Sequence, residues 1–423
     1  MPGPLDGIRI LEFTEIIAGP FGGMLLSDMG ADIIKVEPPW GEPWRFAQPF
    51  LPTESRAYIS LNRGKRSLPL DLTKSEGLAI IYKLIPEIDV IIINARPDVP
   101  YNLGIDFETL SAKNPKLIYC ENTAFGPQGR DAYRPGYDIV IQAMSGLMAS
   151  EGKIQDGIPQ QIQSTAIADY ATGITIAWAV CAALYHRERT GKGQKVEASL
   201  LGTALAVQGG RFMQLAVVDD EPRAELLEAL AQLRADGAPY EEVQAKYRQQ
   251  QSALRRFNAY YRPYQAKNGI VTVGCLSDRL RKRMADLLGL YDIRFLPDYD
   301  PTSEESLVFM QDLVNKAEAI FKEKTVEEWL VLFDEAGVPA GPMRFVEELV
   351  TDEQVVANNL VVELNHSLAG SVKMVGPAIN MSESPLEAKR ASPALGEHSG
   401  EILEHLGYSP EEIQKLKDDN VTR

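Results

Sequence analysis

The 423-residue sequence contains few cysteines and lacks a long hydrophobic run. Its three cysteines are Cys120, Cys181 and Cys275, and no two of them have Cys-x-x-Cys spacing. This pattern is typical of a reducing compartment rather than of a disulfide framework. The longest apolar run, residues 174–184, is shorter than the ~18–20 residues that span a membrane. The opening MPGPLDGIRILEF does not have the basic and then apolar pattern of a signal peptide, so we expect a cytoplasmic protein without membrane contact.

Positive charge and histidine are also scarce. There are 43 Lys and Arg residues against 59 Asp and Glu residues, which gives a formal net charge of −16. Such a charge repels the phosphate backbone of nucleic acid, which we therefore exclude as a partner. The four histidines lie outside metal-binding spacings and are not near a Ser or Cys motif. The sequence thus gives no reason to expect a metal, and histidine or cysteine catalysis is poorly supported.

Strand-like and helix-like segments alternate over the first two hundred residues. Continuous apolar runs, typical of strands buried on both faces of a parallel sheet, lie at 8–13, 32–36, 90–94 and 117–121. Helical patterns lie at 21–29, 74–84, 107–112, 137–149 and 170–188, and a further strand-like run follows at 195–200. This alternation predicts an α/β fold with an open, doubly wound, Rossmann-like parallel sheet.

The composition changes after residue 218 and indicates a second domain. Residues 1–218 form the first part of the predicted large α/β domain. Residues 219–257 are charged, rich in Ala, Leu and Gln, and helical in period, so we interpret them as a helical linker or insert with solvated surface helices. A smaller α/β domain is predicted at 258–336, and residues 337–423 are expected to return to the large domain.

The stretch ILEFTEIIAGPFGGMLLSDMGADIIKVE, residues 10–37, has the strand, turn, helix and strand order of a dinucleotide-binding unit. A dinucleotide fingerprint requires Gly-x-Gly-x-x-Gly directly after the first strand. Here the glycines stand at 19, 22 and 23, and Pro20 has no N–H for a pyrophosphate. We therefore expect neither a nicotinamide nor a flavin cofactor.

Several other stretches occur together and in a fixed order. They are the opening segment PLDGIRILEF…AGPFGGMLLSDMGADIIKVEPP, NRGKRSLPLDL, INARPDVPYNLGIDFETL, RPGYDIVIQAMSG, HRERTGKGQKVEASL, GVPAGPM and LGEHSGEIL. This series resembles CoA-transferase family III, the group of formyl-CoA and carnitine CoA-transferases, from about Pro4 to about Leu406 and most weakly over 219–256. The resemblance implies an enzyme that moves CoA from an acyl-CoA thioester to a carboxylic acid acceptor. It further implies an interlocked homodimer with no cofactor beyond CoA, which is itself a substrate.

By this resemblance the catalytic residue is Asp169, in STAIADYATGITIAWAV. A side-chain carboxylate can form an acyl anhydride and then a thioester with CoA, as this transfer requires. At the start of a long apolar helix, free N–H groups and the helix dipole also stabilise the charged form of an aspartate, by ~0.3–1 kcal/mol. Taken alone, the residue is better explained as a plain helix cap, and the family resemblance reverses that order.

The resemblance also implies which residues surround the ligands. Those expected to bind CoA are Ile16, Pro38, Leu72, Asn94, Ala95, Arg96, Leu103 and Tyr137. Those expected to line the substrate pocket are Ile17, Tyr58, Asp138, Tyr260 and Arg262. The candidate cations for the CoA phosphates are Arg63, Lys65, Arg66, Arg96 and Arg134, each of which is also compatible with an ordinary surface charge.

The sequence departs from the formyl-CoA transferases at three places. Ile17 and Pro38 stand where those enzymes have a glutamine and an arginine, and residues 258–263 replace their glycine-rich loop. We therefore expect a larger acid than formate or oxalate, such as a C4–C5 dicarboxylate whose distal carboxylate pairs with Arg262. The alternative for this segment is a strand pair of the small domain with Arg262 in solvent.

Two other functions remain open. Racemases and epimerases of 2-methylacyl-CoA share this family-like fold and use a histidine where this sequence has Tyr137. A tyrosine with its reference pKa of ~10 is a poor base at neutral pH, which favours transfer over racemisation. The second alternative is a non-catalytic subunit of a heteromeric CoA-transferase, which the intact Asp169 disfavours.

Overall fold

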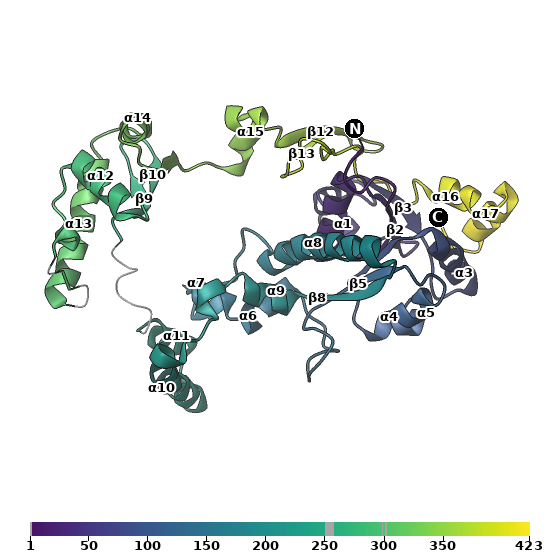
Figure 1. Cartoon of the computed structure of the whole chain (residues 1–423), viewed down its shortest axis with the longest axis horizontal. Coiled ribbons are helices and arrows are strands. Elements are labelled where there is room, and N and C mark those ends of the chain that lie inside the picture. The colour runs from purple at the N-terminus through teal and green to yellow at the C-terminus, as the bar shows by residue number, and fades with distance from the viewer. Residues whose placement is uncertain (1, 250–257, 298, 301–302) are drawn as a thin grey trace. The chain divides into compact units, whose positions relative to one another are not determined.

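The computed structural model describes residues 2–249, 258–297, 299–300 and 303–423 (Figure 1). The chain forms two compact units, of which the larger combines Met1–Leu215 with Glu353–Arg423 and the smaller is Ala216–Asp352. The return to the large unit therefore begins at Glu353 and not at residue 337 as predicted. The predicted linker at 219–257 belongs to the small unit where it is described, and its last part, 250–257, lies outside the described residues.

The large unit is built on a six-stranded sheet in which every pair of neighbours is parallel. The strands are β1 (Arg9–Phe13), β2 (Asp32–Glu37), β3 (Lys65–Pro69), β4 (Val90–Ile93), β5 (Ile118–Thr123) and β8 (Gln194–Ser199). Their spatial order, β3-β2-β1-β4-β5-β8, grows outward in both directions from β1. This is the order of a doubly wound sheet, and the predicted mixed α/β fold with a parallel sheet is confirmed.

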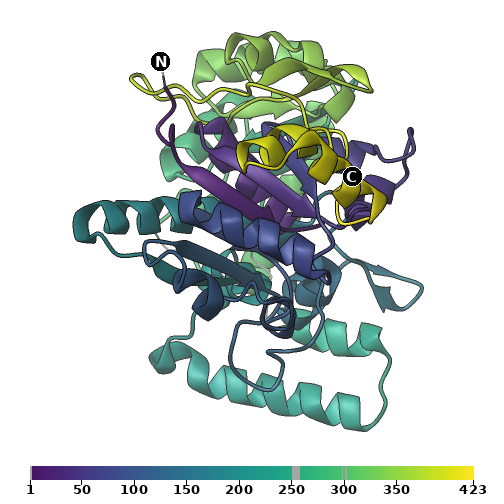
Figure 2. The same cartoon turned by 90° about the vertical axis from the view of Figure 1, so that its right-hand side faces the viewer.

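Helices cover both faces of this sheet (Figures 1 and 2). The helices of the large unit are α1 (Ala18–Asp28), α2 (Arg56–Ile59), α3 (Ser75–Leu84), α4 (Asp98–Leu103), α5 (Phe107–Ser111), α6 (Asp138–Met144), α7 (Leu147–Glu151), α8 (Ile167–Thr190), α9 (Leu200–Ala206), α15 (Glu353–Ala357), α16 (Ser399–His405) and α17 (Pro410–Asp418). One apolar core joins the sheet to α3, α5, α16 and α17, and a second joins it to α1 and α8. The sheet is thus buried on both sides, as its apolar strands require.

Two helices, α1 and α8, pack closely because glycines face each other across their contact. A Cβ on Gly22 would lie 2.9 Å from Ile176, and one on Gly173 would lie 2.8 Å from Phe21. Of the helices in the described part of the chain, α8 alone is long and apolar enough to cross a membrane by length and composition. Half of that segment is buried against the rest of the unit, as in a core helix.

The chain returns to the large unit through a hairpin, β12 (Val361–His366) and β13 (Gly370–Val375). The final residues then pair with the end of β3. Thr422 forms a β-bridge with Leu70, and the N–H of Asp71 donates to the carbonyl of Val421 at 2.9 Å. Val421 is itself buried in the core beneath α3. The large unit is therefore complete only with both parts of the chain.

The small unit holds an antiparallel sheet in the order β11-β10-β9. Its strands are β9 (Tyr261–Gln265), β10 (Ile270–Gly274) and β11 (Ala340–Pro342), and its helices are α10 (Ala216–Ala235), α11 (Tyr240–Gln249), α12 (Asp278–Leu288), α13 (Glu304–Phe321) and α14 (Val326–Ala336). Aromatic side chains fill the core, where the rings of Tyr264 and Phe321 stack 4.1 Å apart. The unit thus has a core of its own.

Candidate active site

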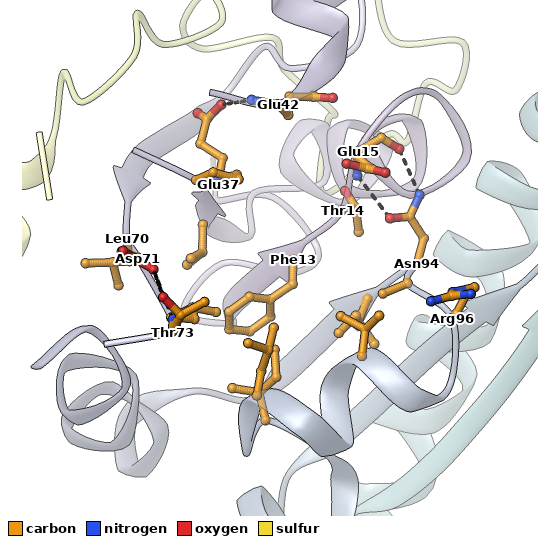
Figure 3. Close-up of a pocket in the computed structure, with 18 of the residues that line it drawn as sticks. Phe13, Thr14, Glu15, Glu37, Glu42, Leu70, Asp71, Thr73, Asn94 and Arg96 are labelled. Carbon is orange, nitrogen blue, oxygen red and sulfur yellow. Dashed lines mark hydrogen bonds between the residues drawn. The ribbon is translucent and has the colours of Figure 1, made fainter. Parts of the chain in front are cut away.

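A cavity of about 540 Å³ opens at the carboxyl ends of the strands in the large unit (Figure 3). The ends of β1, β2, β3 and β4 and the segments that follow them form most of its wall, at residues 13–15, 36–40, 70–73 and 93–96. Glu42, Val99, Leu103, Ile105 and residues 135–137 complete it. The strand order reverses between β1 and β4 at this point. Open α/β sheets bind ligands at such a position, and the volume suits part of a molecule as large as CoA.

The structure brings the residues that were expected to bind CoA together in this cavity, with one exception. Pro38, Leu72, Asn94, Ala95, Arg96, Leu103 and Tyr137 all line it. Ile16 does not, since only its neighbours Thr14 and Glu15 do. The positions carried over from the family resemblance thus come from different loops and meet at one edge of the sheet.

Other residues of the cavity are not predicted by the sequence. Trp40 lies on the wall and is 66% exposed, and Asp71 and Thr73 lie on the wall after β3. An exposed tryptophan directly after Pro38-Pro39 at a strand end is a signal that could have been used. The sequence pattern does not place Asp71 and Thr73 at the end of a strand, because it does not predict β3.

Asn94 holds the protein's own backbone as well as facing the cavity. Its Oδ1 accepts from the N–H of Glu15 at 3.0 Å, and its Nδ2 donates to the carbonyl of Glu15 at 2.8 Å (Figure 3). Arg96 is the one basic residue among the described residues that line the cavity, and it is half-exposed, 3.3 Å from Asp98. An anionic ligand in this cavity would therefore meet a single guanidinium on this wall.

Asp169 lies in the first turn of α8, buried, close to this cavity but not on its wall. Tyr137 and Asp138 connect the two. Tyr137 lines the cavity, while Oδ1 of the next residue, Asp138, accepts from the N–H of Ala168 at 2.8 Å and of Asp169 at 3.3 Å. The expected nucleophile is thus connected to the expected CoA site by two consecutive residues, Tyr137 and Asp138.

The environment of Asp169 favours its protonated form. Burial, and secondly the negative charge of Asp138, raise the pKa of Asp169 to about 7. The expectation that the helix N-terminus would stabilise the charged form is wrong, because Asp138 accepts the first-turn N–H groups in its place. Asp138 is held in turn by Gln142, whose Nε2 donates to Oδ2 at 2.5 Å. The result is a carboxyl group poised to change charge near neutral pH.

Tyr58 does not line a substrate pocket. Its side chain is fully buried, its hydroxyl accepts from Arg45 at 2.6 Å, and the Arg45 guanidinium lies 3.6 Å from the ring centroid. Tyr58 and Arg45 both belong to a buried polar region around Glu37 and Glu54. The tyrosine hydroxyl accepts a hydrogen bond from a buried guanidinium there. The sequence alone does not distinguish such a tyrosine from one that lines a pocket.

Most of the cations proposed for the CoA phosphates also have other partners. Arg63 is buried against Asp28, Lys65 is buried against Glu12, and Arg66 is paired with Asp32. Arg134 is exposed and pairs with Asp131 at 2.9 Å. Arg63 and Lys65 thus neutralise buried carboxylates, and Arg66 pairs with a half-exposed one, which corrects their assignment as phosphate ligands.

The remaining substrate-pocket candidates lie in different places. Ile17 is the residue directly before α1 in the large unit. In the small unit, Tyr260 is fully buried and donates its hydroxyl to Asp292 at 2.8 Å, so its prediction as a pocket wall is wrong. Arg262 lies on β9 and pairs with Glu318 at 2.8 Å. The backbone here is the strand pair that was the alternative for this segment.

The groups that could supply other chemistry are poorly placed for it. All three cysteines are free thiols, and burial raises the pKa of Cys120 to about 12. His366 is buried, and its Nδ1 accepts from the N–H groups of Leu368 and Ala369. In the described part of the chain, no group of three or more His, Cys, Asp and Glu side chains could hold a metal ion. The chemistry that the site offers is that of a carboxyl group.

A buried carboxyl group with a raised pKa near a ligand-sized cavity is typical of a functional site on a parallel α/β sheet. The chain belongs to CoA-transferase family III, whose sequence model matches residues 5–399. It is an enzyme that transfers CoA between an acyl-CoA and a carboxylate. The predicted family and class of activity are confirmed.

The named relatives act on different acids. A succinyl-CoA:glutarate CoA-transferase of Mus musculus is 32% identical over 98% of this chain and 89% of its own. A succinate–glutarate CoA-transferase of Agrobacterium fabrum is 33% identical over 95% of this chain and 96% of its own. A formyl-CoA:oxalate CoA-transferase of Rhodopseudomonas palustris is 29% identical over 100% and 98%.

A solved structure of the same family has the same fold. It is that of a CaiB/BaiF family protein from Brucella suis, 30% identical in sequence. It superposes with a TM-score of 0.73 and covers 96% of this chain and 100% of its own. The likeness therefore extends over both units of the chain.

Proposed function

We propose that this enzyme moves CoA from a dicarboxylic acyl-CoA such as succinyl-CoA to a C4–C5 dicarboxylate, with Asp169 as the covalent nucleophile. The observation that carries the proposal is the buried carboxyl group of Asp169 beside the CoA-sized cavity. The substrate class is supported by the names of the mouse and Agrobacterium relatives, which act on succinate and glutarate. Ile17 in place of a polar residue is consistent with an acid larger than formate.

The reaction proceeds through two anhydrides and one enzyme-bound thioester. The Asp169 carboxylate attacks the thioester carbonyl of the donor, the C–S bond breaks, and CoA leaves as a thiolate. The thiolate attacks the aspartyl carbonyl of the anhydride, which releases the donor acid and leaves an aspartyl-CoA thioester. The acceptor carboxylate displaces CoA from this thioester, and the thiolate then attacks the acceptor carbonyl, which frees Asp169. Each step uses only carboxylates and a thiolate, so we propose that no metal or redox cofactor is needed.

The proposal is tested by removing the nucleophile and by trapping it. Asp169→Ala should abolish CoA transfer between succinyl-CoA and glutarate, followed by mass spectrometry, while CoA binding persists. Borohydride or hydroxylamine added with succinyl-CoA should modify Asp169 in the wild type. As a control, Asp156→Ala changes an exposed aspartate in a turn and should leave transfer unchanged. Transfer by Asp169→Ala at the wild-type rate would refute the mechanism.

We also propose that the enzyme is a homodimer. The family resemblance implies it, and α8 carries exposed apolar side chains at Ile174, Trp178 and Tyr185. Exposed apolar surface of this kind is typical of a protein interface. Light scattering should give twice the mass of the chain, and Trp178→Glu should lower the measured mass. A monomer in the wild type at micromolar concentration would contradict the proposal.

A further inference from the structure

The segment from Thr14 to Pro20 contributes both to the cavity wall and to the surroundings of Asp169. Glu15 lies on the cavity wall, and its backbone is held by Asn94 (Figure 3). Four residues later in α1, Gly19 approaches the side chain of Thr14, and Ala18 packs with Ala168 in one buried cluster. Ala168 directly precedes Asp169. A shift of this segment would therefore change both the cavity and the surroundings of the nucleophile.

Buried charged side chains hold the backbone of this segment at three points. Lys35 donates to the carbonyl of Thr14 at 2.7 Å, and Lys65 donates to the carbonyl of Pro20 at 2.8 Å. Between them, Oε2 of Glu42 accepts from the N–H of Ile16 at 2.9 Å. The segment, of which the last three residues begin α1, is thus also fixed by side chains from β2, β3 and the loop after β2.

These side chains form one group that we call the buried charge cluster: Glu12, Lys35, Glu42 and Lys65, each at most 1% exposed. Lys35 lies 3.2 Å from both Glu12 and Glu42, and Lys65 lies 2.9 Å from Glu12. Burying such charges is unfavourable unless each one is paired, and apolar residues of similar size are often at least as stabilising. Stability alone is therefore a poor reason for this cluster.

The point held by Glu42 is a strained one. Ile16 has a φ of 69°, in the left-handed region that a β-branched side chain rarely adopts. Backbone strain of this kind persists only where surrounding contacts fix it, and it is concentrated at functional sites. The contact that fixes the N–H of Ile16 is the Glu42 carboxylate.

We propose that Glu42 is a positioning residue for CoA transfer, which through the N–H of Ile16 holds the wall of the CoA cavity near Asp169 in its reactive place. The inference rests on the proposed function of Asp169. Glu42 is itself a lining residue of the cavity, but its side chain is only 1% exposed, and its carboxylate accepts from the N–H of Ile16 at 2.9 Å. Covalent transfer requires the thioester carbon and the attacking oxygen to lie within ~3–3.5 Å, so a small displacement of this wall lowers kcat.

The matched control for Glu42 is Glu54. Glu54 is a carboxylate that is equally buried, 3.1 Å from Arg45 and 3.4 Å from His366. Among the described contacts its side chain makes none with residues 14–20. Glu42→Gln and Glu54→Gln each remove one buried charge at constant size, but only Glu42→Gln weakens the bond to Ile16. Glu42→Asp keeps the charge and withdraws it from Ile16, and it serves where Glu42→Gln folds poorly.

The experiment measures backbone protection and transfer separately in purified full-length protein. By hydrogen exchange and mass spectrometry, Glu42→Gln and Glu42→Asp should exchange about tenfold faster than the wild type in the peptide covering residues 14–20. Glu54→Gln should match the wild type there. In transfer from succinyl-CoA to glutarate, both Glu42 variants should lose about 10- to 100-fold in kcat with little change in KM.

Equal protection of residues 14–20 in the wild type and the Glu42 variants would overturn the inference, as would equal losses of kcat in Glu42→Gln and Glu54→Gln. These outcomes are distinct from a failure of the proposed function. If the wild type itself transferred no CoA to any dicarboxylate, the proposed function would fail, while the exchange result would still report on Glu42.

Discussion

In the proposed mechanism, the protonation of Asp169 decides whether its carboxyl group can react. Only the carboxylate can attack a thioester, and burial together with Asp138 raises its pKa to about 7. We therefore expect kcat/KM to fall about tenfold per pH unit below pH 7 and to level above it. The measurement is a transfer assay from pH 5 to pH 9 with a donor whose own ionisation is constant in this range.

A substitution at Asp138 tests the cause of this pH dependence. Asp138→Asn removes the neighbouring negative charge, so the midpoint should move to lower pH, though not to the ordinary value because burial is the larger cause. Asp156→Asn, at an exposed turn, should leave the midpoint in place. An unchanged midpoint in Asp138→Asn would show that Asp138 does not set the pKa.

The same raised pKa has a consequence for stability, with a definite sign. The folded protein keeps the proton of Asp169 up to about pH 7, whereas the unfolded chain releases it near 3.8. The free energy of unfolding contributed by this group therefore falls as pH rises from about 4 to about 7. Asp169→Asn should be more stable than the wild type by up to roughly 4 kcal/mol at pH 8. Urea unfolding at pH 8 and pH 4 checks this, and a gain of equal size at both values contradicts it.

For single residues, the sequence indicates which side chains line the cavity when a motif places them at the end of a strand. It does not indicate this for residues whose polar group forms a hydrogen bond inside the core. Leu72 and Arg96, which the family resemblance implies for CoA binding, both line the cavity, because parallel strands bring such loops together. Tyr58 and Tyr260 were not, because a tyrosine hydroxyl can satisfy a buried Arg45 or Asp292 as well as a ligand. The pattern along the chain does not reveal which partner is present.

At the scale of elements, the contact of α1 with α8 sets the position of Asp169. A Cβ on Gly173 would lie 2.8 Å from Phe21 and 2.9 Å from the carbonyl of Ala18. Gly173→Ala should therefore destabilise the protein by ~1–3 kcal/mol through overpacking, although alanine is the better helix former by ~1 kcal/mol. Thermal unfolding measures the change.

The control for this prediction is a helical glycine in open space. A Cβ on Gly400, in α16, would meet nothing within 4 Å. Gly400→Ala should thus stabilise the protein by ~0.5–1 kcal/mol. A destabilisation of the same size at both glycines would mean that close packing of α1 on α8 is not the cause.

The four strands with continuous apolar runs were predicted, as was β8, whereas β3 was missed. The run before Asn94 became β4, in which Val90–Ile93 are all buried. β3 was missed because it reads KRSLP, and its Lys65 and Ser67 are nonetheless fully buried. Lys65 is buried because Glu12, on β1, supplies the opposite charge. A pairing between side chains far apart in the sequence cannot be read from local hydrophobicity.

At the scale of the whole molecule, the end of the chain supports the wall of the cavity. Val421 is buried, the carbonyl of Val421 accepts from Asp71, and the hydroxyl of Thr422 donates to the carbonyl of Pro69 at 2.7 Å. Removal of residues 421–423 should cost roughly 2–4 kcal/mol through lost burial and hydrogen bonds. It should also weaken CoA binding, because Asp71 lines the cavity.

Binding can be followed by the fluorescence of Trp40, which lies on the same wall. Arg423→Ala is the control, since the side chain of Arg423 is exposed. Its loss should change neither the free energy of unfolding nor the affinity for CoA. Unaltered CoA affinity in the shortened protein would contradict the link between the final residues and the cavity. The sequence did not predict this link, because the closing contact joins residues that are about 350 positions apart.

The closing contact between Leu70 and Thr422 also sets the order in which the protein can fold as it is synthesised. The ribosome completes residues 216–352, the small unit, before it has made the second part of the large unit. At ~5–20 residues per second, residues 1–215 wait roughly 10 to 40 seconds for residue 422. During that time the apolar surface that α16, α17 and Val421 later cover is open to water. We expect chaperones to bind the nascent chain there, and slower translation to prolong that binding.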